Sequence, residues 1–507
     1  MFHTPSPGAR RCAAWPAPSR VAATLALAIG LHGTALASPA SDIADLKKSI
    51  AAMKADYDRR IGTLESQLHA TQDALAKANA AALAAASAPA APVVAVAAAP
   101  GVAVAAAGEA APVQAVAPPP PVDTSAAAPT AAVAGGANAF NPSISLILSG
   151  LYAHTSQDPA QARITGFALP PGAEIGVGSR GFSLQESELA LAANIDPYLS
   201  GNINLSITGD DTISAEEAFI TTTALPDGLV LKAGRFFSGV GYLNSQHAHT
   251  WDFVDNPLAY QALLGTQYAD DGLQLHWLAP TDQYMEFGLE AGRGRSFPGD
   301  DSSRNAAGMT AFTFHTGGDV GDSNSWRGGL SLLQASANGQ ALQDLARDGS
   351  ELAESFSGRT RVWVADGVWK WAPDGNATRT YFKLQGEFLQ SRRSGSLAVD
   401  DGIAAPLRTI QSGGYVQGVW QFMPMWRLGL RTERLDPGHA DYGANASLLA
   451  SSDYHPTKNS LMVDFNPSEF SRFRLQLAQD RSRQGAPDNQ FLLQYQTSLG
   501  AHGAHSY

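Results

Sequence analysis

Short turns alternate with longer polar segments along residues 139–507, and a run of alternating apolar and polar side chains lies between each turn and the next segment. Outer-membrane barrels have short turns at one rim and longer loops at the other. If both ends of the barrel lie at the short-turn rim, that rim carries one turn fewer than half the strands, so seven turns predict about sixteen strands. The turns are residues 195–198, 225–228, 280–283, 317–325, 373–376, 423–425 and 466–469.

Charged side chains alternate with apolar ones inside the predicted strands, as where Lys383 separates Phe382 from Leu384. Alternation alone also fits a soluble β-sandwich. Two further features favour a membrane barrel. The strands reach about 9–12 residues, the length that a tilted membrane strand needs, and aromatic residues such as Tyr198, Trp369 and Trp426 lie beside the turns, as in an interfacial girdle. We therefore predict an all-β fold, a transmembrane antiparallel up-and-down barrel of about sixteen strands.

The first 37 residues have the three parts of a cleavable secretory signal. Arginines precede an apolar run at residues 21–31, and small residues follow at 35–37. This run is too short to span a bilayer as a helix. The one cysteine of the chain, Cys12, lies in this segment. The mature protein is therefore expected to have no disulfide and no thiolate metal ligand.

Two further segments precede the barrel. Residues 41–78 carry apolar side chains from Ile43 to Leu75 at spacings of three, four and seven, which is typical of a coiled coil and weakly favours three helices. A single amphipathic helix resting on the barrel mouth is the alternative. Residues 79–138 are almost entirely Ala, Val and Pro and predict a disordered, extended linker. The predicted domains are a signal peptide (1–37), a periplasmic coiled coil (41–78), this linker (79–138) and the barrel (139–507).

The layout resembles the sixteen-stranded porins of Gram-negative outer membranes, in particular the group related to the phosphate-selective porins O and P. The resemblance rests on the signal and heptad segments, the opening strand at 141–146, the stretch 232–239 and the last strand, which ends at Tyr507. It implies a homotrimer in the lipid bilayer and lipopolysaccharide, inserted by the barrel-assembly machinery, with a third loop folded into each pore. The coiled coil would lie in the periplasm, within reach of peptidoglycan.

The third long connection, residues 236–271, is the longest between predicted strands, and we expect it to narrow the pore. Its candidate constriction residues are Phe236, Gly239, His247, His249, Trp251, Asp252, Asp255 and Tyr260. Charged residues on one face of the strands are expected to line the pore. These are Glu186, Glu188, Glu286, Glu290, Arg361, Arg379, Lys383, Glu387, Arg427, Arg431, Glu433, Arg472 and Arg474.

The charge of the barrel departs from the phosphate-selective pattern, which implies a lumen rich in Arg and Lys. Residues 139–507 hold four Lys and 21 Arg against 38 acidic residues, and the whole chain has a formal charge of −12. Acids and arginines facing one lumen predict a transverse field without strong ion selectivity. Phosphate selectivity is therefore not expected, and the net negative charge argues against a nucleic-acid partner.

His247 and His249, with Asp252 and Asp255 nearby, have residue types found in metal sites, and alternate positions on an extended loop place both imidazoles on one side. His502 and His505 are a second such pair. Solvated histidines are the alternative at both places. Some members of the resembling group are called zinc-regulated TonB-dependent receptors, which keeps the metal hypothesis open. A receptor barrel of 22 strands needs more chain than residues 139–507 provide.

These features predict a porin-like channel in the cell outer membrane for passive diffusion of small hydrophilic solutes or ions. An outer-membrane receptor for a metal or another small ligand, of the zinc-regulated or TonB-dependent type, and a closed structural barrel remain alternatives. No cofactor is predicted. Ser238, Ser245 and His247 lie close in sequence, but no strained elbow or oxyanion hole accompanies them, so no enzymatic activity is predicted.

Overall fold

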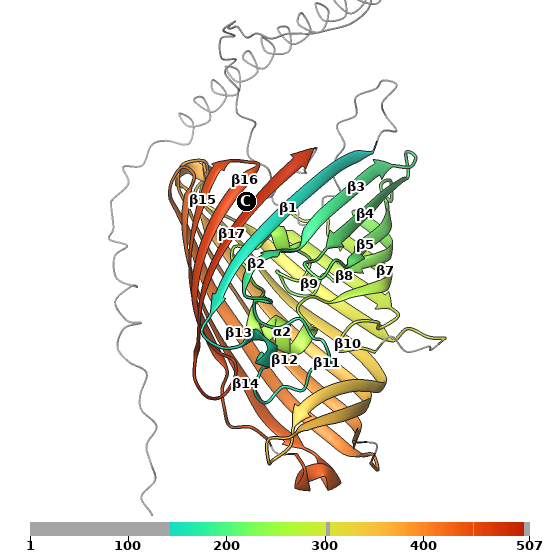
Figure 1. The fold of residues 1–507 in the computed structure, drawn as a ribbon. Coiled ribbons are helices and arrows are strands. Elements are labelled where there is room, and N and C mark those ends of the chain that lie inside the picture. The colour runs from blue at the N-terminus through green and yellow to red at the C-terminus, as the bar shows by residue number, and fades with distance from the viewer. Residues whose placement is uncertain (1–141, 301–304, 401, 450, 501–507) are drawn as a thin grey trace, which may run out of the picture. The chain divides into compact units, whose positions relative to one another are not determined.

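The computed structural model describes residues 142–300, 305–400, 402–449 and 451–500, which form a closed antiparallel barrel (Figure 1). The predicted signal peptide, coiled coil and linker, and His502 and His505, lie outside these residues. The strands are β1 (Ser143–Thr155), β2 (Gly181–Leu184), β3 (Ser187–Asn194), β4 (Leu199–Ile207), β5 (Ile213–Thr222), β6 (Leu229–Phe237), β7 (Ala269–Leu278), β8 (Tyr284–Gly292), β9 (Met309–Val320), β10 (Asn324–Leu345), β11 (Glu351–Trp371), β12 (Tyr381–Val399), β13 (Ala405–Met423), β14 (Trp426–Asp441), β15 (Thr457–Ser468), β16 (Ser471–Arg481) and β17 (Asp488–Gly500).

Short helices interrupt the connections between strands. They are η1 (Pro159–Gln161), η2 (Ala248–Thr250), α2 (Leu258–Leu264), η3 (Pro373–Gly375) and η4 (Gly443–Ser447). In the part of the chain described, no helix is long and apolar enough to cross a membrane.

The wall has sixteen strand positions, as the turn count predicted. Each strand pairs with its sequence neighbour, and β1 closes the barrel by pairing with β17. β2 and β3 occupy one position, because β2 pairs with Gly150–Ala153 of β1 and β3 pairs with Ser143–Ile147. The seventeen named strands therefore make a sixteen-strand barrel.

The two rims differ in how the strands are connected. Both ends of the barrel lie at one rim, where Ser145 of β1 faces Gly500 of β17. All seven predicted turns lie at this short-turn rim, between β3 and β4, β5 and β6, β7 and β8, β9 and β10, β11 and β12, β13 and β14, and β15 and β16. The opposite rim carries loop L1 (residues 156–180) and the neck of loop L3 (residues 238–268).

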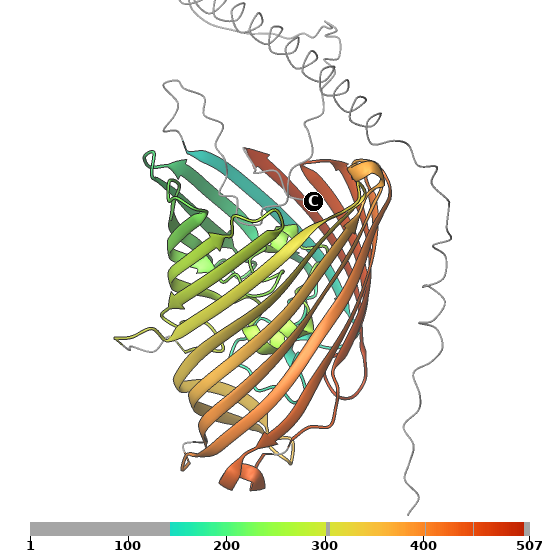
Figure 2. The same ribbon diagram turned by 180° about the vertical axis from the view of Figure 1, so that it is seen from behind.

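The prediction that every connection at the opposite rim is a long polar loop is wrong. Residues 208–212, 346–350 and 400–404 are short connections, and β10 and β11 run for 22 and 21 residues. Segments that read as polar loops instead continue the wall, because they keep their alternation and pair their backbone groups with the next strand. The barrel thus has a tall wall at β10–β14 and a short wall at β2–β8 (Figures 1 and 2).

The outer face of the tall wall changes from apolar to polar along each strand. Leu330, Trp363 and Phe388 point outward and are exposed. Further from the short-turn rim, Arg361 donates to Gln334 (2.9 Å) and Arg392 donates to Gln390 (3.2 Å) on the same outer face. These polar side chains mark where the apolar band of the wall ends.

Aromatic rings gather near the short-turn rim, as the girdle of an outer-membrane barrel requires. Trp426 contacts Phe465 with ring centroids 4.7 Å apart, and Phe473 contacts Tyr495 at 4.6 Å. Trp369 of β11 contacts Phe382 of β12 with ring centroids 5.9 Å apart. These pairs are cross-strand neighbours, so they also fix the register of the strands that carry them.

The interior of the barrel holds a hydrophobic core. Helix α2 of loop L3 is buried along its whole length. Ile164 and Phe167 of loop L1 belong to the same cluster as α2, as do Val364, Leu389 and Leu435 of the tall wall. Two inward-folded loops, rather than the one that was expected, therefore fill part of the lumen.

Candidate functional site

Loop L3 is the element that crosses the lumen, and Asn244 ties its two ends together. The Asn244 side-chain amide donates to the carbonyl oxygens of Ser238 (2.8 Å) and Tyr268 (2.9 Å), and its Oδ1 accepts from the Tyr268 backbone N–H. Phe236, which was assigned to the loop, is instead a fully buried residue of β6. The loop therefore begins at residue 238, two residues later than the sequence indicated.

Three predicted pore-lining glutamates accept hydrogen bonds from the backbone of loop L3. Glu290 of β8 accepts from the N–H of Gly239 (2.7 Å), and Glu433 of β14 accepts from the N–H of Leu258 (2.6 Å). Glu387 of β12 accepts from the N–H groups of residues 242 and 243 and from the Tyr260 hydroxyl (2.8 Å). The sequence placed these acids on the inward face but did not indicate that they bind the loop.

Gly241 allows the close approach to Glu387. Its φ is +71°, a left-handed conformation, and a Cβ at this position would lie 2.7 Å from the Tyr260 hydroxyl. Any side chain there would be strained and would clash with its neighbours. Burial raises the pKa of the Tyr260 hydroxyl well above its ordinary value, and Glu387 raises it further. Tyr260 is therefore held as a neutral hydrogen-bond donor.

The two aspartates of loop L3 pair with basic residues of β12, β14 and β15. Asp252 lies 2.5 Å from Lys383 Nζ and 3.3 Å from Arg427 Nη1. Asp255 lies 2.7 Å from Arg431 and 2.5 Å from Lys458 Nζ. Burial opposes ionisation of both aspartates, but these cations hold the pKa of each below its ordinary value. The charges that were expected to face each other across open space are therefore paired.

A further set of inward-facing residues supports these pairs. Arg474 donates to Asp464 (2.8 Å), which also binds Arg427. Arg472 donates to the carbonyl oxygen of His249 (2.9 Å) in loop L3. Asp464 and Lys458 are wholly buried and were missing from the predicted site. Their inward alternation with apolar residues along β15 was the signal that would have found them.

Two predicted pore-lining residues do not face the lumen. Arg361 points to the outer face of β11, on the same side of the strand as Trp363, and is exposed. Arg379 is exposed in the turn between β11 and β12. The expectation that they line the pore is wrong, because β11 extends beyond the apolar band and the turn sequence continues to residue 380. Glu286 does face inward, 3.4 Å from His276 Nδ1.

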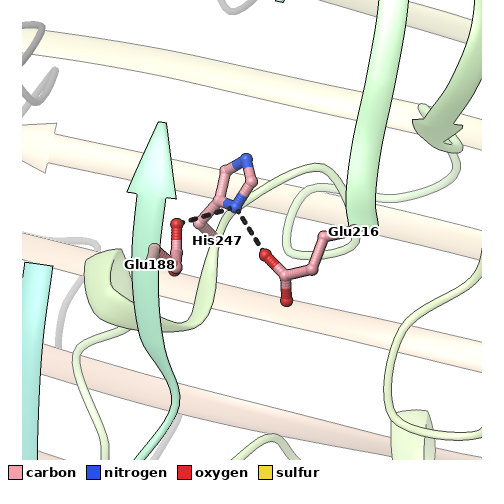
Figure 3. A group of neighbouring side chains, drawn as sticks. All are labelled: Glu188, Glu216 and His247. Carbon is pink, nitrogen blue, oxygen red and sulfur yellow. Dashed lines mark hydrogen bonds and ion pairs between the residues drawn. The ribbon is translucent and has the colours of Figure 1, made fainter. Parts of the chain in front are cut away.

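Two histidines of loop L3 meet acids of the short wall, and Figure 3 shows His247 with Glu188 and Glu216. His247 Nδ1 lies 3.2 Å from Glu188 Oε2 and 3.3 Å from Glu216 Oε2, and its Nε2 lies 3.0 Å from Glu217 Oε2. His249 Nδ1 lies 2.6 Å from Glu188 Oε1. The His247 and His249 rings stack with centroids 5.7 Å apart, so the two imidazoles do lie on one side.

In the acid–histidine cluster, formed by Glu188, Glu216, Glu217, His247 and His249, the pKa values of the two histidines shift in opposite directions. Burial alone would lower the pKa of His247, but its carboxylate neighbours raise it well above the ordinary value. Burial lowers the pKa of His249 despite the contact with Glu188. Asp252 and Asp255, the acids that the sequence grouped with these histidines, instead bind the tall wall. Glu216 and Glu217, in the middle of β5, were not predicted as site residues.

A cavity of about 510 Å³ lies on the loop L1 side of loop L3. Its lining includes Arg163 and Arg180 of loop L1, Gln261 of α2, and Asp480 and Gln490 of the wall. Charges of both signs therefore surround it, and it adjoins the buried helix of loop L3. Away from this cavity, the side chains of Lys383, His247 and Glu216 remain partly exposed.

Several solved outer-membrane proteins resemble the chain in structure. The outer membrane channel DcaP of Acinetobacter baumannii is 11% identical, with a TM-score of 0.43 over 72% of this chain and 99% of that one. The anion-selective porin from Comamonas acidovorans is 11% identical, with a TM-score of 0.44 over 71% and 99%. OprB of Pseudomonas putida is 13% identical, with a TM-score of 0.43 over 71% and 94%.

Comparison of the sequence with family models finds no match. A relative of much higher identity exists in Aquifex aeolicus (strain VF5), where it is named an uncharacterized protein. It is 32% identical over 395 residues, which cover 73% of this chain and 80% of the relative. The chain, a sixteen-strand antiparallel barrel, therefore belongs to the same protein family as this Aquifex aeolicus protein.

Proposed function

We propose that the protein is an outer-membrane channel for passive diffusion of small hydrophilic solutes, with loop L3 as its constriction. The observation that carries this proposal is the division of the wall, with apolar side chains outside and charged, hydrogen-bonded side chains such as Glu387 and Arg431 inside. A barrel with a polar lumen in a lipid bilayer is the architecture of a porin. Loop L3 crosses that lumen, so it controls the width of any path.

The orientation follows from the rims. Short turns face the periplasm in outer-membrane barrels and longer loops face outward, so the short-turn rim is assigned to the periplasm. A signal peptide at 1–37 would direct export, and a coiled coil at 41–78 would lie in the periplasm, where it could reach peptidoglycan. The last strand would carry the signal that the barrel-assembly machinery recognises.

Weak ion selectivity is part of the proposal. Asp252 and Asp255 of loop L3 are neutralised by Lys383, Arg427, Arg431 and Lys458. Paired charges present little net field to a passing ion at the level of the constriction. The solute class is therefore small and hydrophilic rather than phosphate in particular, which departs from the phosphate-selective porins O and P.

A homotrimer is proposed through the short wall. Large apolar side chains of the short wall are highly exposed, including Phe182 at 89% and Ile213 at 67%. β4, β6 and β8 have 9 residues each, against 22 and 21 in β10 and β11, so this side of the barrel is much lower than the tall wall. Packing of three short walls against one another would cover these side chains.

Lipopolysaccharide is the proposed partner of the outer leaflet. Arg361 and Arg392 face each other directly on neighbouring strands, outside the barrel. Like charges in this position destabilise a sheet. Arg359 and Arg408 lie exposed in adjacent registers of the same surface. Phosphate groups of a lipid at the edge of the apolar band would offset this positive charge.

A closed structural barrel is the second candidate, and the packing of α2 favours it. The helix is buried along its length against the tall wall, and loop L1 packs on it. In this reading loop L3 is a permanent plug. The two candidates predict different electrical behaviour for the same protein.

Planar-bilayer recording of the purified full chain separates the two. Light scattering in detergent first establishes the mass of the particle, which we expect to be three chains. We then expect discrete current steps of low conductance, with reversal potentials close to zero under a salt gradient. The absence of steps at every salt concentration, in the wild type and in a variant with weakened loop L3 contacts, would rule out the channel and leave the closed barrel.

A further inference from the structure

The acid–histidine cluster gathers more negative charge than its basic neighbours neutralise. Glu188 and Glu217 are buried, at 2% and 8% exposure. In the described residues, the ion pairs of Glu188, Glu216 and Glu217 are with His247 and His249 alone. The ammonium of Lys232 lies over the Phe219 ring, 4.4 Å from its centroid. Buried carboxylates without a matching cation are costly to maintain.

We propose that His247, Glu188 and Glu216 form a binding site for a divalent transition-metal cation, of which Zn²⁺ is the representative. One atom from each residue contributes, and the three atoms lie within 4.8 Å of one another. His247 Nδ1 stands between the two carboxylates, 3.2 Å from Glu188 Oε2 and 3.3 Å from Glu216 Oε2 (Figure 3). Neighbouring ligands of a tetrahedral Zn²⁺ site with bonds of about 2.0–2.1 Å are about 3.3 Å apart.

The contacts around these three residues match those that orient metal ligands in proteins. A ligating histidine usually donates its second ring N–H to a carboxylate. His247 Nε2 lies 3.0 Å from Glu217 Oε2, which leaves Nδ1 directed at the proposed site. Glu188 is held in turn through its second oxygen, 2.6 Å from His249 Nδ1.

Two buried oxygen atoms beside the cluster have no hydrogen-bond partner in the described residues. They are Glu186 Oε1 and Asn204 Oδ1. Asn204 is only 6% exposed, and its amide nitrogen donates to Glu217 Oε2 (3.2 Å). Glu186 interacts with Glu216, but it is not among the three residues whose ligand atoms gather at the proposed site. Unpaired buried oxygens are costly in a protein interior.

The donor set indicates the class of metal. One imidazole nitrogen with two carboxylate oxygens and no sulfur suits Zn²⁺ and similar first-row cations better than Ca²⁺ or Mg²⁺, which take oxygen ligands alone. Binding displaces the proton that His247 Nδ1 otherwise shares with the carboxylates. The ligands come from β3, β5 and loop L3, so the cation would join the loop to the short wall, opposite the wall that binds Asp255.

The test measures metal binding by the untagged full chain, folded in detergent and stripped with a chelator. Titration calorimetry with Zn²⁺ is run on a His502→Ala/His505→Ala background, which removes the two terminal histidines. We expect one Zn²⁺ per chain. X-ray absorption at the zinc edge should then show nitrogen and oxygen ligands at about 2.0–2.1 Å and no sulfur.

Single substitutions assign the site. Glu217→Gln removes an outer contact and should weaken binding by about 10–100-fold, whereas His247→Ala and Glu216→Gln should weaken it further. His276→Ala is the matched control, because His276 also lies beside an inward glutamate, 3.4 Å from Glu286, and its affinity should equal that of the parent. Heat-dependent gel mobility confirms that each variant is folded.

Two results would overturn the proposal. A folded parent chain that binds no Zn²⁺ would mean that these residues do not form a metal site. Zn²⁺ bound with unchanged affinity by folded His247→Ala and Glu216→Gln chains would place the metal elsewhere. Neither measurement depends on conductance, so this proposal can fail while the proposed channel stands.

Discussion

At the scale of single residues, Asp255 contributes most directly to the position of loop L3. Its carboxylate binds Arg431 and Lys458, and it also accepts from Gln476 (2.9 Å). Lys458 is wholly buried and Asp255 is 7% exposed. In such a place the loss of one partner leaves the other charge without compensation, which costs more than the ion pair contributes.

We expect Asp255→Asn to lower the free energy of unfolding by about 3–5 kcal/mol, the usual effect of breaking a buried pair. Urea unfolding followed by tryptophan fluorescence measures this change. The matched control is Asp436→Asn, because the Asp436 carboxylate is exposed and its one ion pair in the described residues, with the exposed His455, is long at 3.7 Å. The control should match the wild type. Equal stability of both variants would contradict the assigned role of Asp255.

Residues that alternate with apolar side chains along the strands could be assigned to the lumen from sequence, and most of those predicted do face inward. Arg361 could not be assigned correctly, because the same alternation continues on the part of β11 beyond the apolar band, where outward residues are polar too. The partners of His247 could not be predicted either. Glu188 and Glu216 are separated from it by 59 and 31 residues, and the pairing of β3 and β5 with β4, together with the inward fold of loop L3, brings them together.

At the scale of elements, loop L3 is held against opposite walls by different chemistry. Histidines and the Gly239 N–H contact the short wall, while aspartates, the N–H groups of residues 242, 243 and 258, and α2 contact the tall wall. If loop L3 sets the width of the channel, weakening these contacts should widen it. A reversible crosslink then decides whether movement of the loop is responsible.

Ala259 of α2 and Gly413 of β13 are suited to such a crosslink. A Cβ at Gly413 would lie 3.4 Å from the Ala259 Cβ, close to the spacing in disulfides. The end of the Leu435 side chain must move to make room. Cleavage of the proposed signal peptide would remove Cys12, and the engineered pair would then provide the sole thiols of the mature chain.

We expect Asp255→Asn to raise single-channel conductance, and the added pair Ala259→Cys/Gly413→Cys to return it to the wild-type value when oxidised. Dithiothreitol should restore the higher conductance. The same cysteine pair without Asp255→Asn is the control and should respond little to reduction. If the oxidised and reduced triple variants conduct equally, movement of loop L3 does not set the conductance.

At the scale of the whole molecule, the outer surface relates the barrel to the membrane. The apolar band begins near the aromatic rings of the short-turn rim and ends at the polar side chains of β10–β12. The tall wall continues beyond this band, away from the short-turn rim. We expect this part of the wall to contact lipid headgroups. Arg361 and Arg392 lie at that boundary.

We expect Arg361→Gln/Arg392→Gln to reduce the lipopolysaccharide that copurifies with the protein, because two cations that would bind phosphate are lost. Mass spectrometry of the extracted lipid measures the amount per chain. Arg379→Gln removes an exposed cation at the short-turn rim and should leave it unchanged. An equal amount of lipid in all three proteins would contradict the proposed contact.

The class of the fold and the number of its strand positions follow from the sequence by itself, because turns and two-residue alternation are local properties of the chain. The seven turns that predicted sixteen strands all lie at one rim. Tertiary structure alone decided which connections become wall and what loop L3 binds. Those outcomes depend on pairing between strands and on charges far apart in sequence, such as Asp255 and Lys458, and no local pattern encodes such distances.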